Sequence, residues 1–353
     1  MNFYNFHNFA QLQVVGSGKI ARDIKDNLFF FSASKSDLTT IKVVIDDSIN
    51  KHEITSSLGN ERKLSFHKKN NNFYIKKNGE ALLIAGNKNI NNIDDITVTS
   101  NFDISILMLL IELNLRQLSI KNDIALFHGS AAEILNNGIV FFGWQGAGKT
   151  SAVISCILNG YNFLSEDKIW LSKNEIFAYP RYVRINSSNI HLFLKEIPRS
   201  KRFIYYLLEL LEKIKETFFI PKIFRTILNK GLLIPSIKMN ISDLVPGAKI
   251  SSKANLSKLI YIQRSLSNNA KNYFPEDWKK KNSNISFYEW DSEIIEILCA
   301  HDSLFNTNSN WVEQFNLHLN AEMDVIYNIF NKNQVQIMNT SFKQNFIKME
   351  SIH

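Results

Sequence analysis

Short runs of alternating apolar and polar residues fill the first hundred positions of the chain. "NLFFFSA", "TTIKVVI" and "ITVTS" are rich in aromatic and β-branched residues, and Asn, Asp, Ser and Gly separate them. In "NNFYIKKNGEALLIAG", two such runs flank Lys77–Gly79, where Asn-Gly supplies the positive φ angles of a hairpin turn. The pattern predicts a β-rich N-terminal domain over residues 1–101.

The period of the apolar positions then changes to that of a helix. Apolar residues recur at helical spacing in "FDISILMLLIELNLRQLSI", at Ile106, Leu109, Leu110, Leu113 and Leu118. We expect a helix over 102–120 that leads into a second domain, residues 102–335. Strands follow at Ile124–His128 with Ala131–Leu135, and at Ile139–Phe142, joined by a turn at Asn136–Gly138.

The rest of the second domain reads as a helical insert followed by further core elements. Residues 186–238 have a mostly helical pattern, with breaks at Pro221 and Pro235. Such an amphipathic segment either packs on the core or forms a lid or partner groove. "LSKLIYIQRS" predicts a core strand, and Ala321–Asn331 a helix. Residues 336–353 read as a polar tail.

Charge and composition narrow the classes of partner. The 353 residues carry 41 basic and 33 acidic side chains, a formal charge of +8, which favours acidic partners such as nucleotides, although a solvated basic face explains it equally well. The basic residues are dispersed and no aromatic-basic platform stands out, so we expect no nucleic-acid partner. The longest apolar segment is interrupted by polar residues and the two cysteines are far apart, which predicts no membrane partner and a cytoplasmic location.

One short stretch carries recognisable chemistry. In "FFGWQGAGKT", Gly143, Gly148, Lys149 and Thr150 fit the phosphate-loop pattern G-x-x-x-x-G-K-[ST]. Glycines let main-chain N–H groups approach phosphate oxygens, the lysine reaches the β- and γ-phosphates, and the threonine hydroxyl can hold Mg²⁺. A buried-strand pattern precedes the loop, and a helical one that stops at Asn159-Gly160 follows it. The expected nucleotide-binding residues are Gly143, Gln145, Gly146, Ala147, Gly148, Lys149, Thr150 and Ser151.

Two adjacent acids follow the loop's helix in "GYNFLSEDKIWLS". Glu166 and Asp167 stand in an otherwise apolar strand pattern, so their side chains are expected on opposite faces. One would order Mg²⁺ or accept a proton from an incoming hydroxyl, while the other would be held by Lys168, Arg181 or Arg184. The alternative is an exposed turn or edge-strand pair.

The run from Ala125 to Leu171, "ALFHGSAAEILNNGIVFFGWQGAGKTSAVISCILNGYNFLSEDKIWL", resembles the catalytic domain of the HPr kinase/phosphorylase family and its HPr-kinase-like serine kinase relatives. The resemblance covers about fifty residues well and continues weakly through "IFAYPRYVRI" and "ISDLVPGAKISSKANLSKLIYIQRS". It implies an α/β fold with a P-loop kinase core of the HPr kinase/PEP carboxykinase type. In that core the first acid serves as general base.

Carried onto this chain, the resemblance gives roles to particular residues. Glu166 stands where the family usually has its first Asp, and Asp167 matches the second; because Glu is one methylene longer, either acid could be the base. His128 matches a histidine near the phosphates, where it could stabilise negative charge; alternatively it is a hydrogen-bonded core residue. Arg181, Arg184 and Arg264 are candidates for contacting phosphate or substrate, and a surface role explains Arg264 equally well.

The family's second signature, a Glu-containing strand followed by Arg-Gly-x-Gly, is not found in the sequence. Its absence, together with a first hundred residues that show no such resemblance, argues against HPr as the substrate. The resemblance then implies transfer of the γ-phosphoryl group of ATP, with Mg²⁺, to a hydroxyl of a peptide or protein other than HPr. A serine of a precursor peptide is one such acceptor, and the resemblance allows for a homo-oligomer. The alternative is a non-catalytic nucleotide-binding switch that signals through the insert.

Overall fold

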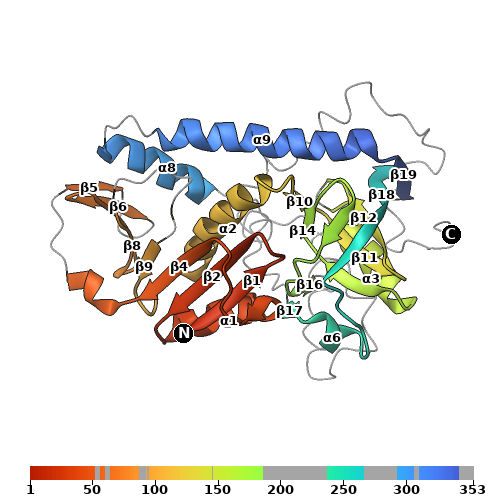
Figure 1. The fold of residues 1–353 in the computed structure, drawn as a ribbon, viewed down its shortest axis with the longest axis horizontal. Helices are drawn as coiled ribbons and strands as arrows, with labels where there is room; N and C mark the ends of the chain where they lie inside the picture. The colour runs from red at the N-terminus through yellow and green to blue at the C-terminus, as the bar shows by residue number, and fades with distance from the viewer. Residues whose placement is uncertain are drawn as a thin grey trace, which may run out of the picture. The chain divides into compact units, whose positions relative to one another are not determined.

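The computed structural model describes residues 1–51, 56–59, 64–86, 93, 95–144, 146–185, 237–265, 292–305 and 310–341. Within these residues the fold is mixed α/β, with two large mixed sheets and six α-helices (Figure 1). Contacts divide the chain into two units. Unit 1 is Met1–Phe127, Leu171–Lys173 and Asp277–Asn331, and unit 2 is His128–Trp170, Asn174–Glu276 and Lys332–His353. This division differs from the expected boundary at 101/102.

Unit 1 contains a nine-stranded sheet in the order β3-β1-β2-β4-β9-β8-β7-β6-β5. Its strands are β1 Asn2–Phe6, β2 Ala10–Val15, β3 Ser32–Ala33, β4 Thr40–Ile45, β5 Ser56–Gly59, β6 Ser65–Lys69, β7 Asn72–Lys77, β8 Glu80–Ile84 and β9 Asp95–Val98. The predicted hairpin is confirmed, because Asn78 and Gly79 have φ angles of 53° and 81° between β7 and β8. The strand predicted from "NLFFFSA" is mostly wrong: Phe29–Phe31 form a 3-10 turn, and only Ser32–Ala33 pair as a strand.

Four helices begin in unit 1: α1 Lys19–Asn27, α2 Ile104–Ile120, α8 Ser292–Phe305 and α9 Trp311–Lys332. The predicted helix over 102–120 is confirmed as α2, whose first turn is capped when the Asp103 carboxylate accepts the Ser105 N–H. It belongs to unit 1 and not to the second unit. The helix predicted at Ala321–Asn331 is the second half of the longer α9.

An eight-stranded sheet has the order β10-β14-β15-β18-β12-β11-β13, with β19 beside β18. Its strands are β10 Ala125–His128, β11 Ser130–Ile134, β12 Asn137–Phe142, β13 Asn162–Ser165, β14 Lys168–Leu171, β15 Glu175–Phe177, β18 Lys253–Ser265 and β19 Val335–Ser341. Most of its residues belong to unit 2, whereas Ala125–Phe127 of β10 and Leu171 of β14 belong to unit 1. The predicted strands and their hairpin are confirmed, although the positive-φ residues are Leu135 and Asn136, one position earlier than expected.

Three parallel strands set the place of the phosphate loop. Phe142 of β12 pairs with Tyr261 of β18, which pairs with Ile337 of β19, and both pairings are parallel. The carboxyl ends of these strands therefore meet at one edge, which is where ligands bind in open α/β sheets. Residues 336–341 were expected in a polar tail, but they form most of β19.

The helix predicted after the loop is confirmed as α3 Lys149–Leu158. Val153, Ile154 and Ile157 are buried against Phe141 and Phe163 in one apolar core cluster of unit 2. The helix α6 Ile241–Leu244 adds two further residues to that cluster. A short ladder joins β16 Val183–Ile185 to β17 Ile237–Met239. The expected helical insert lies outside the described residues except for this β17 strand.

None of the helices in the described part of the chain combines the length and apolar character needed to cross a membrane.

Candidate functional site

The loop between β12 and α3 carries three glycines with positive φ angles. Gly143, Gly146 and Gly148 have φ angles of 144°, 76° and 111°, a region that L side chains rarely adopt. A Cβ on Gly143 would lie 2.4 Å from the Ile262 carbonyl oxygen of β18. A Cβ on Gly146 would meet no atom within 4 Å, so the loop is open on that side. The loop is thus held against β18 at one end and left clear in its middle.

Lys149 begins α3 and closes the loop. Its side chain is 8% exposed, and its ammonium group donates hydrogen bonds to the carbonyl oxygens of Gly143, at 2.7 Å, and Trp144, at 3.3 Å. Burial lowers the pKa of Lys149 to about 8, against the opposing effect of the Asp167 and Glu166 charges. An ammonium has three donors. Two of them bond the loop carbonyls of Gly143 and Trp144.

Ala147, Gly148 and Ser151 lie at the start of α3. Ala147 is buried, and its N–H donates to the Trp144 carbonyl at 3.0 Å. Gly148 caps α3 in the left-handed conformation, and Ser151 is half-buried in the first turn. The partial positive charge of the helix start thus faces the loop. Gln145 lies outside the described residues.

Glu166 and Asp167 do not lie within a strand, as the sequence pattern predicted. They form the two-residue segment between β13 and β14. Asp167 has a φ of 78°, and its carbonyl accepts the Gly129 N–H at 3.1 Å. Aspartate tolerates this left-handed conformation, which interrupts the strand's alternation. The expectation of opposite faces, which assumes a regular strand, therefore does not apply.

Each acid is bound to a different neighbour. The Thr150 hydroxyl donates to Glu166 Oε1 at 2.7 Å, and Glu166 is only 8% exposed. The Asp167 side chain is 39% exposed, and its Oδ1 lies 3.5 Å from Nδ1 of His128, the last residue of β10. Glu166 thus faces the loop's helix, whereas Asp167 is open to solvent beside an imidazole.

The three candidate arginines are placed unequally. The Arg181 guanidinium lies 4.8 Å from the centroid of the Tyr179 ring and donates to its hydroxyl at 3.1 Å. The Tyr179 carbonyl accepts a 2.7 Å hydrogen bond from Ser165, the residue before Glu166. Arg184 lies in β16 beside Lys238, and Arg264 in β18 beside Thr340 at the carboxyl edge; both side chains lie outside the described part.

Sequence reasoning missed two residues at this site. Ser165 ties the acidic segment to Tyr179, and nothing in its sequence context marks it. Trp144 occupies a position of the phosphate-loop pattern that accepts any residue, yet its side chain is 62% exposed at the loop. A large aromatic residue in such a loop was the available signal.

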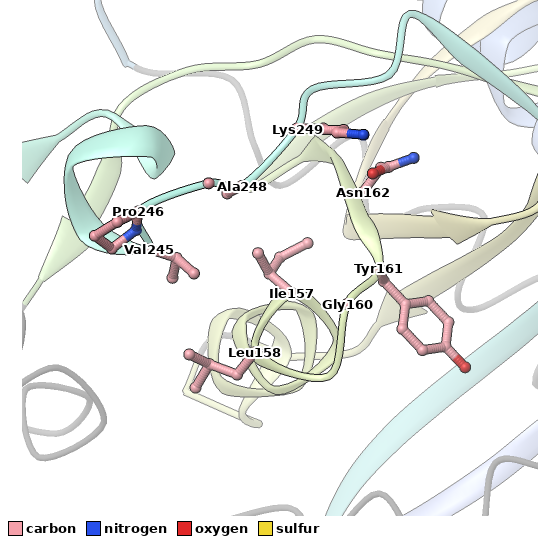
Figure 2. A pocket seen from close by; sticks show the side chains of 10 residues that line it. Ile157, Leu158, Gly160, Tyr161, Asn162, Val245, Pro246, Ala248 and Lys249 are labelled. Atoms are coloured by element: carbon pink, nitrogen blue, oxygen red, sulfur yellow. The ribbon is translucent and has the colours of Figure 1, made fainter.

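A separate pocket of about 360 Å³ lies at the opposite end of α3 (Figure 2). Ile157, Leu158 and Val245 are among its apolar lining residues, and the Lys249 side chain extends beside Asn162. Its lining begins eight residues after Lys149, which is about 12 Å along a helix. The pocket is therefore distinct from the phosphate loop.

The donor set at the loop suits Mg²⁺ bound through a nucleotide. Thr150 and Glu166 offer a hydroxyl and a carboxylate oxygen, and such sites take their other ligands from phosphate oxygens and water. Among the described residues no group of three or more His, Cys, Asp or Glu could hold a metal by itself. The residues fit a metal that arrives with phosphate.

No model of a known protein family matches this chain, and no curated protein matches it either.

Proposed function

We propose that the chain is an ATP-dependent kinase that transfers the γ-phosphoryl group to a hydroxyl of a peptide or protein other than HPr. The observation that carries the proposal is the 2.7 Å hydrogen bond between Thr150 and Glu166, beside a phosphate loop closed by Lys149. It brings a hydroxyl of the loop's helix beside a carboxylate, and in P-loop NTPases a Ser/Thr hydroxyl and an acid hold Mg²⁺ together. The parallel strand ends and the resemblance to HPr-kinase-like serine kinases support the same class.

Nucleotide phosphates would be held by the loop amides and the Lys149 ammonium. The open side of Gly146 leaves room for phosphate oxygens, and the start of α3 favours their negative charge. Thr150 and Glu166 would hold Mg²⁺, which when bound neutralises charge on the β- and γ-phosphates.

The geometry favours Asp167 as the base and Glu166 as the metal-holding acid. Glu166 is buried and engaged with the Thr150 hydroxyl, whereas Asp167 is accessible to an incoming hydroxyl. Asp167 would accept the acceptor's proton on its carboxylate, and His128 would orient that carboxylate. This reverses the order that the family resemblance implies, in which the first acid is the base.

The transfer balances with these groups alone and ATP as co-substrate. The acceptor oxygen forms a bond to the γ-phosphorus while the bond to the β,γ-bridging oxygen breaks. The products are a phosphate ester and ADP, and the hydroxyl proton moves to Asp167. Lys149 stabilises charge that develops on the phosphate oxygens.

The test is to incubate the protein with γ-labelled ATP, Mg²⁺ and serine-containing peptides, and to compare Asp167→Asn. We expect label on peptide hydroxyls, and a rate at least about a hundredfold lower in the variant, because general base catalysis contributes roughly that much. Binding of Mg-ATP should stay the same. Label released only as inorganic phosphate would favour the alternative, a nucleotide-binding switch, and an unchanged rate in Asp167→Asn would remove Asp167 from its role.

A further inference from the structure

Trp144 presents an aromatic surface at the phosphate loop. Its side chain is 62% exposed and is hydrogen-bonded to the Tyr261 side chain, on the neighbouring strand β18. The Tyr261 ring in turn packs against Phe142, with 5.4 Å between the ring centroids. A mostly exposed tryptophan whose side chain is held by a hydrogen bond is typical of a contact residue, because it offers a large apolar area at little entropic cost.

The position of Trp144 within the loop tells which end of the nucleotide it would face. The Lys149 ammonium contacts the carbonyls of Gly143 and Trp144. In a phosphate loop this ammonium serves the β- and γ-phosphates. Trp144 therefore stands at the γ-phosphoryl end of the nucleotide, where the acceptor must approach, and not at the end that carries the adenine ring.

The openness of the ring favours one class of acceptor. Small molecules bind in concave sites that bury most of their surface. The Trp144 side chain is mostly exposed and does not line the pocket at the other end of α3. Such a surface suits an extended polypeptide that lays one side chain on the ring while its hydroxyl enters beside Asp167.

We propose that Trp144 is a specificity-determining residue that selects polypeptide acceptors with an aromatic or large aliphatic side chain next to the phosphorylated hydroxyl. The inference rests on the proposed function and adds the substrate class to it. Tyr261 acts as a positioning residue that holds the indole.

The experiment uses γ-labelled Mg-ATP and a serine-centred peptide library in which one flanking position varies. Wild-type protein should label peptides with Phe, Tyr or Leu beside the serine at least about tenfold faster than those with Ala or Asp, the size of effect seen for tryptophan contacts. Trp144→Ala should abolish that preference, and Trp144→Phe should retain it. The KM for ATP should change by less than about twofold in either variant, because Trp144 lies at the γ end.

Leu135→Ala is the matched control, since Leu135 is 88% exposed in the same unit at the β11–β12 turn. It should leave the preference intact. A preference that survives in Trp144→Ala, or a raised KM for ATP in that variant, would overturn the inference while leaving the kinase proposal in place. Absence of any labelled peptide, with Mg-ATP binding intact, would overturn the polypeptide class itself and also count against the proposed transfer. Loss of Mg-ATP binding by wild-type protein would instead mark failure of the nucleotide site.

Discussion

Among single residues, the proposed nucleotide binding depends most on the charge of Lys149. Burial lowers its pKa to about 8, so the side chain is still mostly an ammonium at pH 7 but mostly neutral at pH 9. A bound triphosphate would favour the charged form. Binding above pH 8 must therefore take up a proton, whereas binding at pH 7 needs almost none.

This linkage predicts how affinity depends on pH. Between pH 8 and pH 9 the affinity for Mg-ATP should fall about fivefold, because the free protein loses the proton that binding requires. Calorimetry at pH 9 in two buffers of different ionisation enthalpy should detect uptake of almost one proton. Lys149→Arg stays charged and should show none of it. Equal proton uptake by the two proteins would contradict the role of Lys149.

The hydrogen bond between Thr150 and Glu166 leads to a prediction about the Mg²⁺ dependence of ATP binding. Glu166→Gln removes a charged oxygen ligand, so the Mg²⁺ concentration for half-maximal ATP binding should rise about tenfold or more. The matched control is Glu175→Gln, because Glu175 pairs with Lys253 at the opposite, amino end of β18. Titration of Mg²⁺ at fixed ATP measures the difference. No shift in Glu166→Gln relative to the control would rule out a metal role for Glu166.

Two glycines of the loop between β12 and α3 lie in different surroundings. Gly143 allows the loop to lie against β18, where a Cβ would clash with the Ile262 carbonyl, whereas Gly146 faces open space. Both have positive φ, so each alanine substitution carries a backbone cost of about 1–2 kcal/mol. Only Gly143→Ala adds a steric clash.

Gly143→Ala should therefore lower the free energy of unfolding by about 3 kcal/mol or more, and Gly146→Ala by about 1 kcal/mol. Gly146→Ala should nevertheless weaken Mg-ATP binding, because its methyl group occupies the space proposed for phosphate. Urea denaturation and calorimetry on both variants separate the two effects. If Gly143→Ala and Gly146→Ala lost equal stability, the close contact with β18 would not be the reason for a glycine at position 143.

The sequence predicted correctly those helices and turns that are marked by local patterns, such as helical periodicity or an Asn-Gly turn. The helix α2, the Asn78-Gly79 hairpin and the order β12, loop, α3 all carry such signals, and all are present. "NLFFFSA" has high strand propensity, but only its last two residues pair in the sheet. Propensity alone could not show this, because strand formation depends on neighbours far away in sequence.

The candidate site was predicted in its parts but not in its arrangement. The motif gave Lys149 and Thr150, and the acid pair stood out by its charge. Asp167 has a left-handed backbone conformation, which interrupts the strand. Glu166 contacts Thr150, whereas Asp167 contacts His128. The expectation that successive side chains point to opposite faces assumes a regular strand. The sequence pattern therefore could not predict that the two acids have different neighbours.

In the whole molecule, unit 1 encloses a cluster of buried charged side chains. Arg116 is almost fully buried and pairs with Glu112 from its own helix and Glu322 from α9. His318 is also on α9 and buried, and its Nε2 has no hydrogen-bond partner among the described residues. Burial, followed by the positive charge of Arg116, lowers the pKa of His318 to about 3. The folded unit therefore keeps this imidazole neutral.

Acid should consequently destabilise the protein through His318. Its folded pKa lies below the ordinary value of about 6.5, so stability is complete above that value and falls as the unfolded chain binds the proton. Between pH 6.5 and pH 5 the loss amounts to about 2 kcal/mol. The free energy of unfolding in urea, measured at pH 7 and pH 5, should drop by that much more in wild type than in His318→Gln. Parallel pH profiles would contradict the neutral, buried histidine.

The central claim is that the loop at the carboxyl edge of the unit 2 sheet holds the phosphates of a nucleotide. Calorimetric titration of Mg-ATP into wild-type protein and Lys149→Ala at pH 7 tests it most directly. We predict one Mg-ATP bound per wild-type chain and an affinity about a hundredfold lower in the variant, because a charged hydrogen-bonding group is lost from a largely buried site. Absence of binding heat in wild type, or equal affinity in the two proteins, would contradict the claim.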